Sequence, residues 1–179
     1  TVQINEDKKI TSLSGGSGFS LSSGDYWLKV DLNCYFRDFE ISCNRQFLTT
    51  MLYQKQNSET IYVSETTHSS SSSGTTNEKV NSSCMKKGIS CDYESTLWGA
   101  FALQSIGENV NAYLPYLTVM AEDNSNLLPE SFLYHISGNT DFKNQLLSKQ
   151  INNKWWLSLN DRYYGTAQAL IPLRYEESS

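Results

Sequence analysis

The sequence has no apolar run of about 18 residues, the length that a helix needs to cross a lipid bilayer. We therefore expect no transmembrane segment. Positive charge is also scarce, because 14 Lys and Arg residues stand against 19 Asp and Glu residues and give a formal net charge of -5. Phosphate binding requires a basic face. The charge balance therefore predicts that neither nucleic acid nor an anionic membrane surface is a partner.

Recognisable catalytic motifs are missing as well. The sequence contains no phosphate-binding loop, no dinucleotide fingerprint and no nucleophile elbow. His135 lies beside apolar residues, where a histidine is more often a packing residue than a general base, and His68 lies in a serine-rich stretch, where we expect it to be solvated. From the sequence we expect no catalytic residue, no metal site and no cofactor.

The chain has 179 residues, which suits one large domain or two small ones. Apolar residues make up 39% and charged residues 18%, and both shares are low for a globular protein, since Ser, Thr and Asn fill the difference. The chain starts at Thr1 with neither Met nor a signal segment, so we expect a processed mature chain or an excised fragment.

The four cysteines fall into two local pairs, Cys34 with Cys43 and Cys84 with Cys91. This pattern predicts two disulfides and an oxidising compartment, hence an extracellular or cell-surface protein. The alternatives are four reduced thiols in a cytosolic chain, or a zinc site, although the spacings are wider than those of a zinc knuckle. Asn81-Ser82-Ser83 also fits an N-glycosylation acceptor.

Residues 1–67 are typical of short strands separated by turns. Leu28, Val30 and Leu32, for example, alternate with polar neighbours. The spacing predicts an antiparallel, immunoglobulin-like β-sandwich domain. Residues 68–83 include an unbroken serine run at 69–73 with little apolar surface to bury, so we expect a mobile linker between two domains there.

Residues 84–179 have a helical period. The stretch 93–107 is apolar almost all round, which predicts a central helix that other helices cover. Asp92 or Ser95 can cap its start, and Gly107 can end it. Further helices are expected at 110–120, 128–136, 141–150 and 163–173, with Asn139 or Thr140 and Gly138 as local start and stop signals.

These helices form a repeat. The segment 102–107 aligns with 133–138, which lies 31 positions later, and each is followed by a more polar helix and a loop. The segment 163–173 is the third apolar member. A fixed period of this size is typical of stacked helical hairpins. We expect the three apolar helices to form an inner layer and the helices at 110–120 and 141–150 to form an outer one.

Residues 92–174 resemble the α/α-toroid superfamily of terpenoid cyclases, protein prenyltransferase β-subunits and complement-type thioester domains. The segment Gln150-Ile151-Asn152-Asn153-Lys154-Trp155-Trp156 is similar to the Q-x-x-(D/N)-G-x-W signature of the cyclases, with Lys154 where the family has glycine. The resemblance implies a partial toroid in which Gln150 and Trp156 are structural.

The catalytic features of that superfamily have no match here. The sequence has no Asp-x-Asp-Asp acid, no Gly-Cys-Gly-Glu-Gln thioester segment and no Asp, Cys and His zinc set. About two and a half hairpins are present, where a full toroid has five to seven. The resemblance therefore implies an open arc, with an apolar flank that the sandwich domain or a partner would cover.

Candidate binding residues lie near the starts of the three apolar helices. Glu94, Glu130 and Asp161 occupy corresponding positions and could ring one end of the arc as a carboxylate-lined cleft for a cation or a sugar. Aromatic residues that include Tyr134, Trp155 and Tyr163 could line a groove that binds a carbohydrate. The alternative is that the acids cap helices and the rings pack in the core.

These observations predict an extracellular or cell-surface, non-enzymatic module for binding or assembly, with a protein partner or self-assembly and a glycan as a further possible ligand. The alternative is an enzyme, or a fragment of one, that acts on glycans or lipids with the acids and aromatics at one end of the arc.

Overall fold

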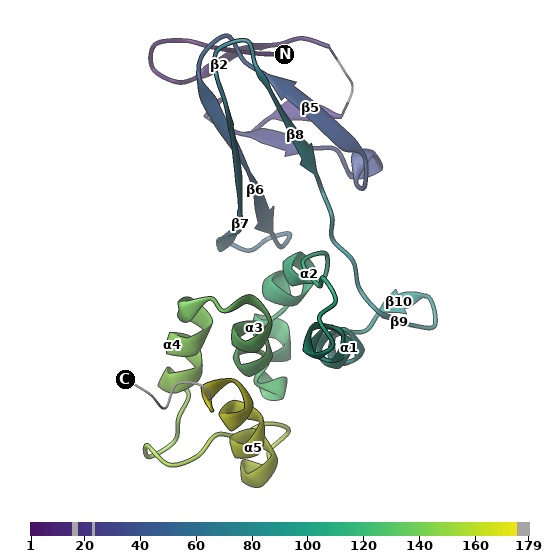
Figure 1. Cartoon of the computed structure of the whole chain (residues 1–179), viewed down its shortest axis with the longest axis vertical. Coiled ribbons are helices and arrows are strands. Elements are labelled where there is room, and N and C mark those ends of the chain that lie inside the picture. Colours follow the sequence, from purple (N-terminus) through teal and green to yellow (C-terminus); the bar gives the residue numbers. More distant parts are fainter. Residues whose placement is uncertain (16–17, 23, 175–179) are drawn as a thin grey trace. The chain divides into compact units, whose positions relative to one another are not determined.

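The computed structural model describes residues 1–15, 18–22 and 24–174. The chain divides into two compact units, Thr1–Asn81 and Ser82–Ser179 (Figure 1). Antiparallel strands build the first unit, and helices make up most of the second. The expected α+β class is therefore confirmed, while the immunoglobulin-like sandwich and the partial toroid remain predictions.

The first unit contains four two-stranded antiparallel sheets, which pair β1 with β2, β3 with β4, β5 with β8, and β6 with β7. No sheet in the described part of the chain closes into a barrel. The strands are β1 (Val2–Ile4), β2 (Ile10–Leu13), β3 (Phe19–Leu21), β4 (Leu28–Val30), β5 (Asp38–Ser42), β6 (Phe47–Gln54), β7 (Ile61–Ser70) and β8 (Thr75–Lys79), and a 3₁₀ turn η1 (Leu32–Cys34) precedes β5.

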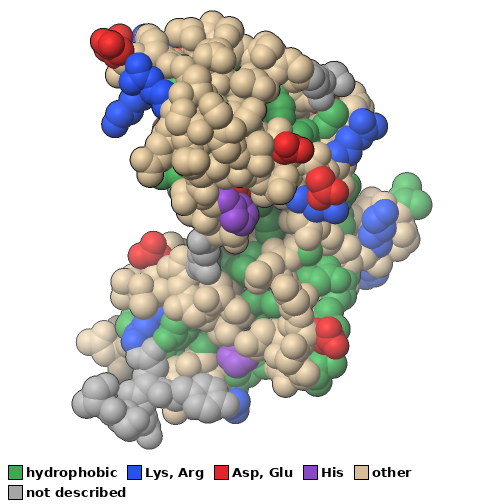
Figure 2. All heavy atoms as spheres, turned by 45° about the horizontal axis from the view of Figure 1, so that its top comes forward, with side chains coloured by type: hydrophobic (Ala, Val, Ile, Leu, Met, Phe, Trp, Pro, Cys, Tyr) green, Lys and Arg blue, Asp and Glu red, His purple; other side chains and the backbone are tan. Residues whose placement is uncertain are grey.

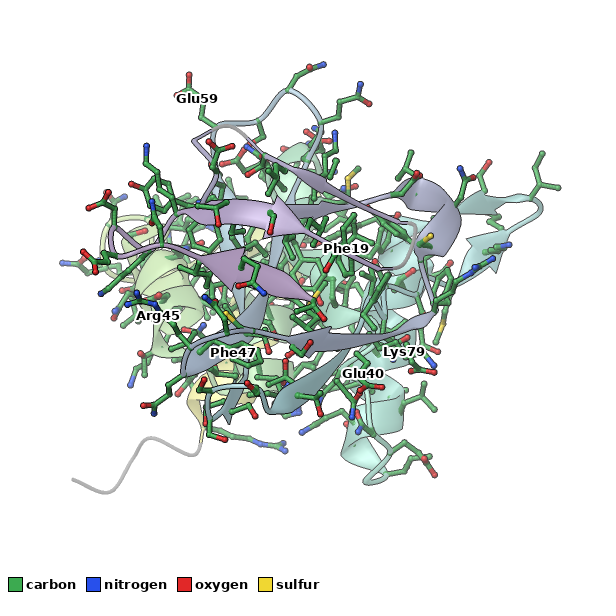
Figure 3. All side chains as sticks on the ribbon, turned by 90° about the horizontal axis from the view of Figure 1, so that it is seen from above. Phe19, Glu40, Arg45, Phe47, Glu59 and Lys79 are labelled. Carbon is green, nitrogen blue, oxygen red and sulfur yellow. A yellow bond between two sulfur atoms is a disulfide. The ribbon has the colours of Figure 1, made fainter. Side chains whose placement is uncertain are left out.

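The core of the first unit is small. Cys34, Phe39 and Val80 are buried together, and the rings of Phe19 and Phe39 lie 4.6 Å apart between their centroids. In Figure 3 Phe19 lies among the strands, whereas Glu59 projects outward from the loop between β6 and β7. With so few buried apolar residues, much of the unit depends on strand pairing and polar contacts.

The expected linker at 68–83 is wrong. β7 extends to Ser70, β8 covers Thr75–Lys79, and residues up to Asn81 belong to the first unit. Residues between these strands form a turn, in which the Gly74 N–H donates to the Ser71 carbonyl and the Ser73 N–H donates to the Cys43 carbonyl. Serine side chains add little apolar surface, but their backbones pair as well as any others when a partner strand is present.

The expected Cys34–Cys43 disulfide is also wrong, because both residues are separate buried thiols. Cys34 packs with Phe39 near the start of β5, and Cys43 follows its end. Cys43 lies four positions after Phe39, and four residues of extended chain span about 13 Å. A disulfide needs Cα atoms within about 7 Å, so β5 holds the two thiols apart.

The second unit opens with a hairpin of β9 (Lys86–Lys87) and β10 (Ser90–Cys91), closed by the expected Cys84–Cys91 disulfide. Helices follow it. They are α1 (Tyr93–Ser105), α2 (Leu114–Val119), a 3₁₀ segment η2 (Glu122–Leu127), α3 (Pro129–Ser137), α4 (Thr140–Ser148) and α5 (Arg162–Leu173).

The central helix of the second unit is α3 and not α1. α3 contacts α1, α2, α4 and α5, and its residues from Pro129 to Leu133 are all buried. α1 buries Leu97 and Ala100 but leaves Ala102 exposed, so it is not covered all round as its composition predicts. Alanine and glycine fit both exposed and buried positions, which makes an apolar composition a weak guide to burial.

The segment 150–156 contributes Trp156 to the core of the second unit. Trp156 is buried with Leu146 and with Ala169 of α5, and its indole N–H donates to the Leu146 carbonyl at 2.7 Å. Outside this segment, the Gln168 side-chain amide ties α5 to the residues that precede α3. Its Nε2 donates to the carbonyls of Leu127 and Leu128. Trp156 therefore has a structural position.

Candidate interaction site

The three predicted acids have three different environments. The Asp161 carboxylate caps α5 by accepting the N–H groups of Tyr163 at 2.7 Å and Tyr164 at 3.0 Å. Glu130 is buried, with an oxygen 2.5 Å from the Lys149 ammonium, and Glu94 is exposed in the first turn of α1. Asp161 thus caps the start of α5, a position at which aspartate is often found.

The predicted aromatic residues also differ. Tyr163 is 74% exposed, and the Arg162 guanidinium lies over its ring, whereas Tyr134 and Trp155 are half-buried. Beside Tyr163, burial raises the pKa of Tyr164, the negative charge of Glu94 adds to that rise, and a hydrogen bond with Trp98 opposes it. The charge of Glu94 therefore acts on Tyr164 of α5, the neighbour of the predicted Tyr163.

Two hollows lie among the described residues away from the predicted acids. A shallow apolar depression is lined by residues of α1, α3 and α5 that include Phe101 and Gln168. In the first unit, a polar hollow of about 290 Å³ is lined by Thr1, Gln3, Ser42, Cys43, Asn44 and Ser73. Glu94, Glu130 and Asp161 line neither of them.

Replacement of Asp161 separates its capping role from a ligand-binding role. We expect Asp161→Ala to lower the free energy of unfolding by about 1 kcal/mol, because two N–H groups at the start of α5 lose their acceptor. Asp161→Asn should be close to wild type, since asparagine caps equally well. Urea denaturation measures both variants. Equal destabilisation by alanine and asparagine would contradict a capping role.

The two histidines lie in different units and have different neighbours. The His135 ring lies 4.9 Å from the Phe101 ring, and burial lowers the pKa of His135, with the positive charge of Arg174 as a second cause. The His68 side chain is exposed, as expected, but it lies on β7 and not in a linker, and its Nδ1 is 2.8 Å from the Glu78 carboxylate. The described residues contain no group of three His, Cys, Asp or Glu side chains that could hold a metal ion.

Glu78 is a buried carboxylate that the sequence analysis missed. It lies on β8 with 6% of its side chain exposed, and both the Thr49 hydroxyl and His68 contact the same carboxylate oxygen. Burial raises the pKa of Tyr53, and the charge of Glu78 adds to the rise, so Tyr53 lies nearby. β8 buries Thr76 and Glu78 on one face, but its five residues are all polar, so the sequence carried no local signal for this burial.

A hairpin at residues 84–91, which we call the stapled hairpin, is exposed from Lys86 to Cys91. Its two ends are joined by the Cys84–Cys91 disulfide, and its strands pair in register. Gly88 and Ile89 form the two-residue turn, with Gly88 at φ +68°, a value that favours glycine. Ile89 is 95% exposed at the tip, next to the exposed Lys86 and Lys87.

The base of the stapled hairpin is fixed to α1. The Met85 N–H donates to the Thr96 hydroxyl at 2.9 Å, and the Asp92 N–H donates to the Met85 carbonyl at 2.9 Å. The Met85 side chain lies over Gly99, where an added Cβ would overlap its sulfur. The hairpin is therefore clamped by backbone, side-chain and covalent contacts.

Apolar and basic side chains are thus presented together on a rigid projection. Figure 1 shows the hairpin extending away from the helices beside α1, and Figure 2 shows hydrophobic and basic side chains side by side on it at the right edge of the molecule. Sequence analysis used only its cysteines. The run Lys86-Lys87-Gly88-Ile89 between them was the signal for a charged and apolar hairpin tip.

Within the described residues, none of the helices combines the length and apolar character that a bilayer crossing requires. No protein-family model, curated protein or solved structure matches the chain. The function therefore has to be argued from the geometry of the stapled hairpin and its surroundings.

Proposed function

We propose that this chain is an extracellular, non-enzymatic binding and assembly module, and that the stapled hairpin is its docking element. The observation that carries the proposal is the exposure of Ile89 at the tip of a doubly fixed hairpin. A rigid loop loses little conformational entropy when it binds, so it presents an apolar anchor efficiently. The disulfide supports an oxidising compartment, and Asn81 is exposed as a glycosylation acceptor must be.

The charges of the hairpin favour an acidic protein partner. Lys86 and Lys87 carry two positive charges on a chain whose net charge is -5, so another copy of the same chain offers a complementary acidic surface. We therefore propose self-assembly through this hairpin. The helices of the second unit, which we propose form an open toroid-like arc, would serve as the rigid support.

The alternative of a glycan-acting enzyme has less support. Hydrolysis of a glycosidic bond uses two carboxyl groups that flank the scissile bond. Of the three predicted acids, Glu130 is paired with Lys149 and Asp161 caps α5, which leaves Glu94 beside Tyr164. One exposed acid does not provide the two carboxyl groups that glycoside hydrolysis uses, so we do not propose this activity.

Sedimentation velocity over a range of protein concentrations tests the proposal. We expect the wild-type chain to self-associate, and Ile89→Ser to weaken association by about 10-fold or more, because the buried isoleucine is lost. Lys86→Glu with Lys87→Glu should weaken it further, and added salt should weaken the wild type.

Ile106→Ser is the matched control, since Ile106 is a comparably exposed isoleucine just after α1. It should associate like the wild type. A wild-type chain that stays monomeric at about 1 mM, or hairpin variants that associate as tightly as the wild type, would rule the proposal out.

A further inference from the structure

A second exposed apolar surface lies on the first unit, around η1. Leu32 is 75% exposed and Phe36 56% exposed, and Tyr35 is exposed between them; we call these three residues the turn patch. Large exposed apolar side chains that cluster are uncommon on monomeric proteins and mark interaction surfaces. The turn patch is therefore a candidate acceptor for an apolar anchor.

The backbone of the turn patch is held in an unfavourable conformation. Phe36 has φ +67°, in the left-handed region that large side chains rarely adopt. Its N–H donates to the Val80 carbonyl at 3.1 Å, and neighbouring Cys34 is buried in the core, so the turn is tied down on both sides. The surrounding contacts therefore hold the Phe36 ring at the surface in a fixed backbone conformation.

Exposed acidic residues flank the turn patch along the chain. Asp31 is exposed directly before Leu32, and Asp38 and Glu40 follow on β5, against the single cation Arg37 in the same segment. Lys79 lies 3.4 Å from Asp38 and neutralises part of this charge. The patch is thus apolar with an acidic border, which complements the apolar tip and two lysines of the stapled hairpin.

We propose that the stapled hairpin of one copy docks on the turn patch of a second copy. This inference rests on the proposed assembly function and names its acceptor. Donor and acceptor are different surfaces, so each copy can both give a hairpin and receive one, and the assembly is head-to-tail. One hairpin covers a small area, so each contact is weak and assembly depends on concentration.

Carbodiimide cross-linking of a mixture of ¹⁴N-labelled and ¹⁵N-labelled chains tests the contact directly. We expect mixed-isotope links from Lys86 or Lys87 to Asp31, Asp38 or Glu40. Links that occur only within one chain, or that join the hairpin lysines to other acids between chains, would overturn the proposal.

A substitution in the acceptor gives an independent test. Phe36→Gly removes the ring and relieves the positive φ, so the first unit should fold at least as well as the wild type. We expect it to weaken self-association by about 10-fold or more, measured by sedimentation velocity. Trp27→Ser is the control, because Trp27 is another exposed aromatic residue of the first unit.

The outcomes separate this inference from the proposed function. If Phe36→Gly associates like the wild type while Ile89→Ser does not, the acceptor is wrong and the hairpin remains the docking element. If neither substitution changes association, both proposals fail. If both weaken it and Trp27→Ser does not, donor and acceptor are established together.

Discussion

Leu133→Ala is expected to lower the free energy of unfolding of the second unit by about 2–5 kcal/mol. Leu133 is fully buried in the middle of α3, the helix that contacts the four other α-helices of that unit. Truncation to alanine removes the transfer free energy of its side chain and leaves a cavity, because helices on several sides cannot all move inward.

Urea denaturation followed by helical circular dichroism measures this effect. Leu147→Ala is the matched control, since Leu147 is the same residue type at a partly exposed position on α4, and we expect it to cost less than about 1 kcal/mol. If the two variants were equally stable, α3 would not be the centre of the second unit.

Thr49→Val is expected to destabilise the first unit by about 1–3 kcal/mol, because the buried Glu78 carboxylate loses the hydroxyl that donates to it. Glu78→Leu is expected to change stability by less than about 1 kcal/mol, because an apolar side chain of similar size removes the charge and the need for partners together. His68 is half-exposed and can then bond to water.

Chemical denaturation of both variants, with the ultraviolet absorbance of tyrosine as a second signal, checks this prediction. Glu78→Leu should lower the pKa of Tyr53 only in part, because burial is the larger cause of its rise and remains. If Glu78→Leu were far more destabilising than Thr49→Val, the carboxylate itself would be essential to the first unit.

Local signals in the sequence predicted the helical half well. α3, α4 and α5 begin and end within two residues of the expected bounds, and Asp92 and Asn139 cap helices as expected. Gly138 ends α3 at φ +70°, and Gly107 follows α1 at φ +87°. These features depend on a few neighbouring residues, so the sequence carries them directly.

Strand pairing and burial were harder to predict. β7 and β8 run through a serine-rich stretch because partner strands β6 and β5 satisfy their backbones, and β5 is distant from β8 in the sequence. The separation of Cys34 from Cys43 by β5 and the burial of Glu78 have the same origin. Each depends on which strands meet, and local composition does not contain that information.

The sequence by itself determined the helix ends, the Cys84–Cys91 staple and the charge balance, since each rests on residues close together in the chain or on composition alone. Only the tertiary structure placed α3 at the centre of the second unit, gave Asp161 and Glu130 their separate partners, and fixed the stapled hairpin to α1 with Ile89 exposed. The physical reason is that burial and exposure are properties of contacts between distant segments, and folding decides those contacts collectively.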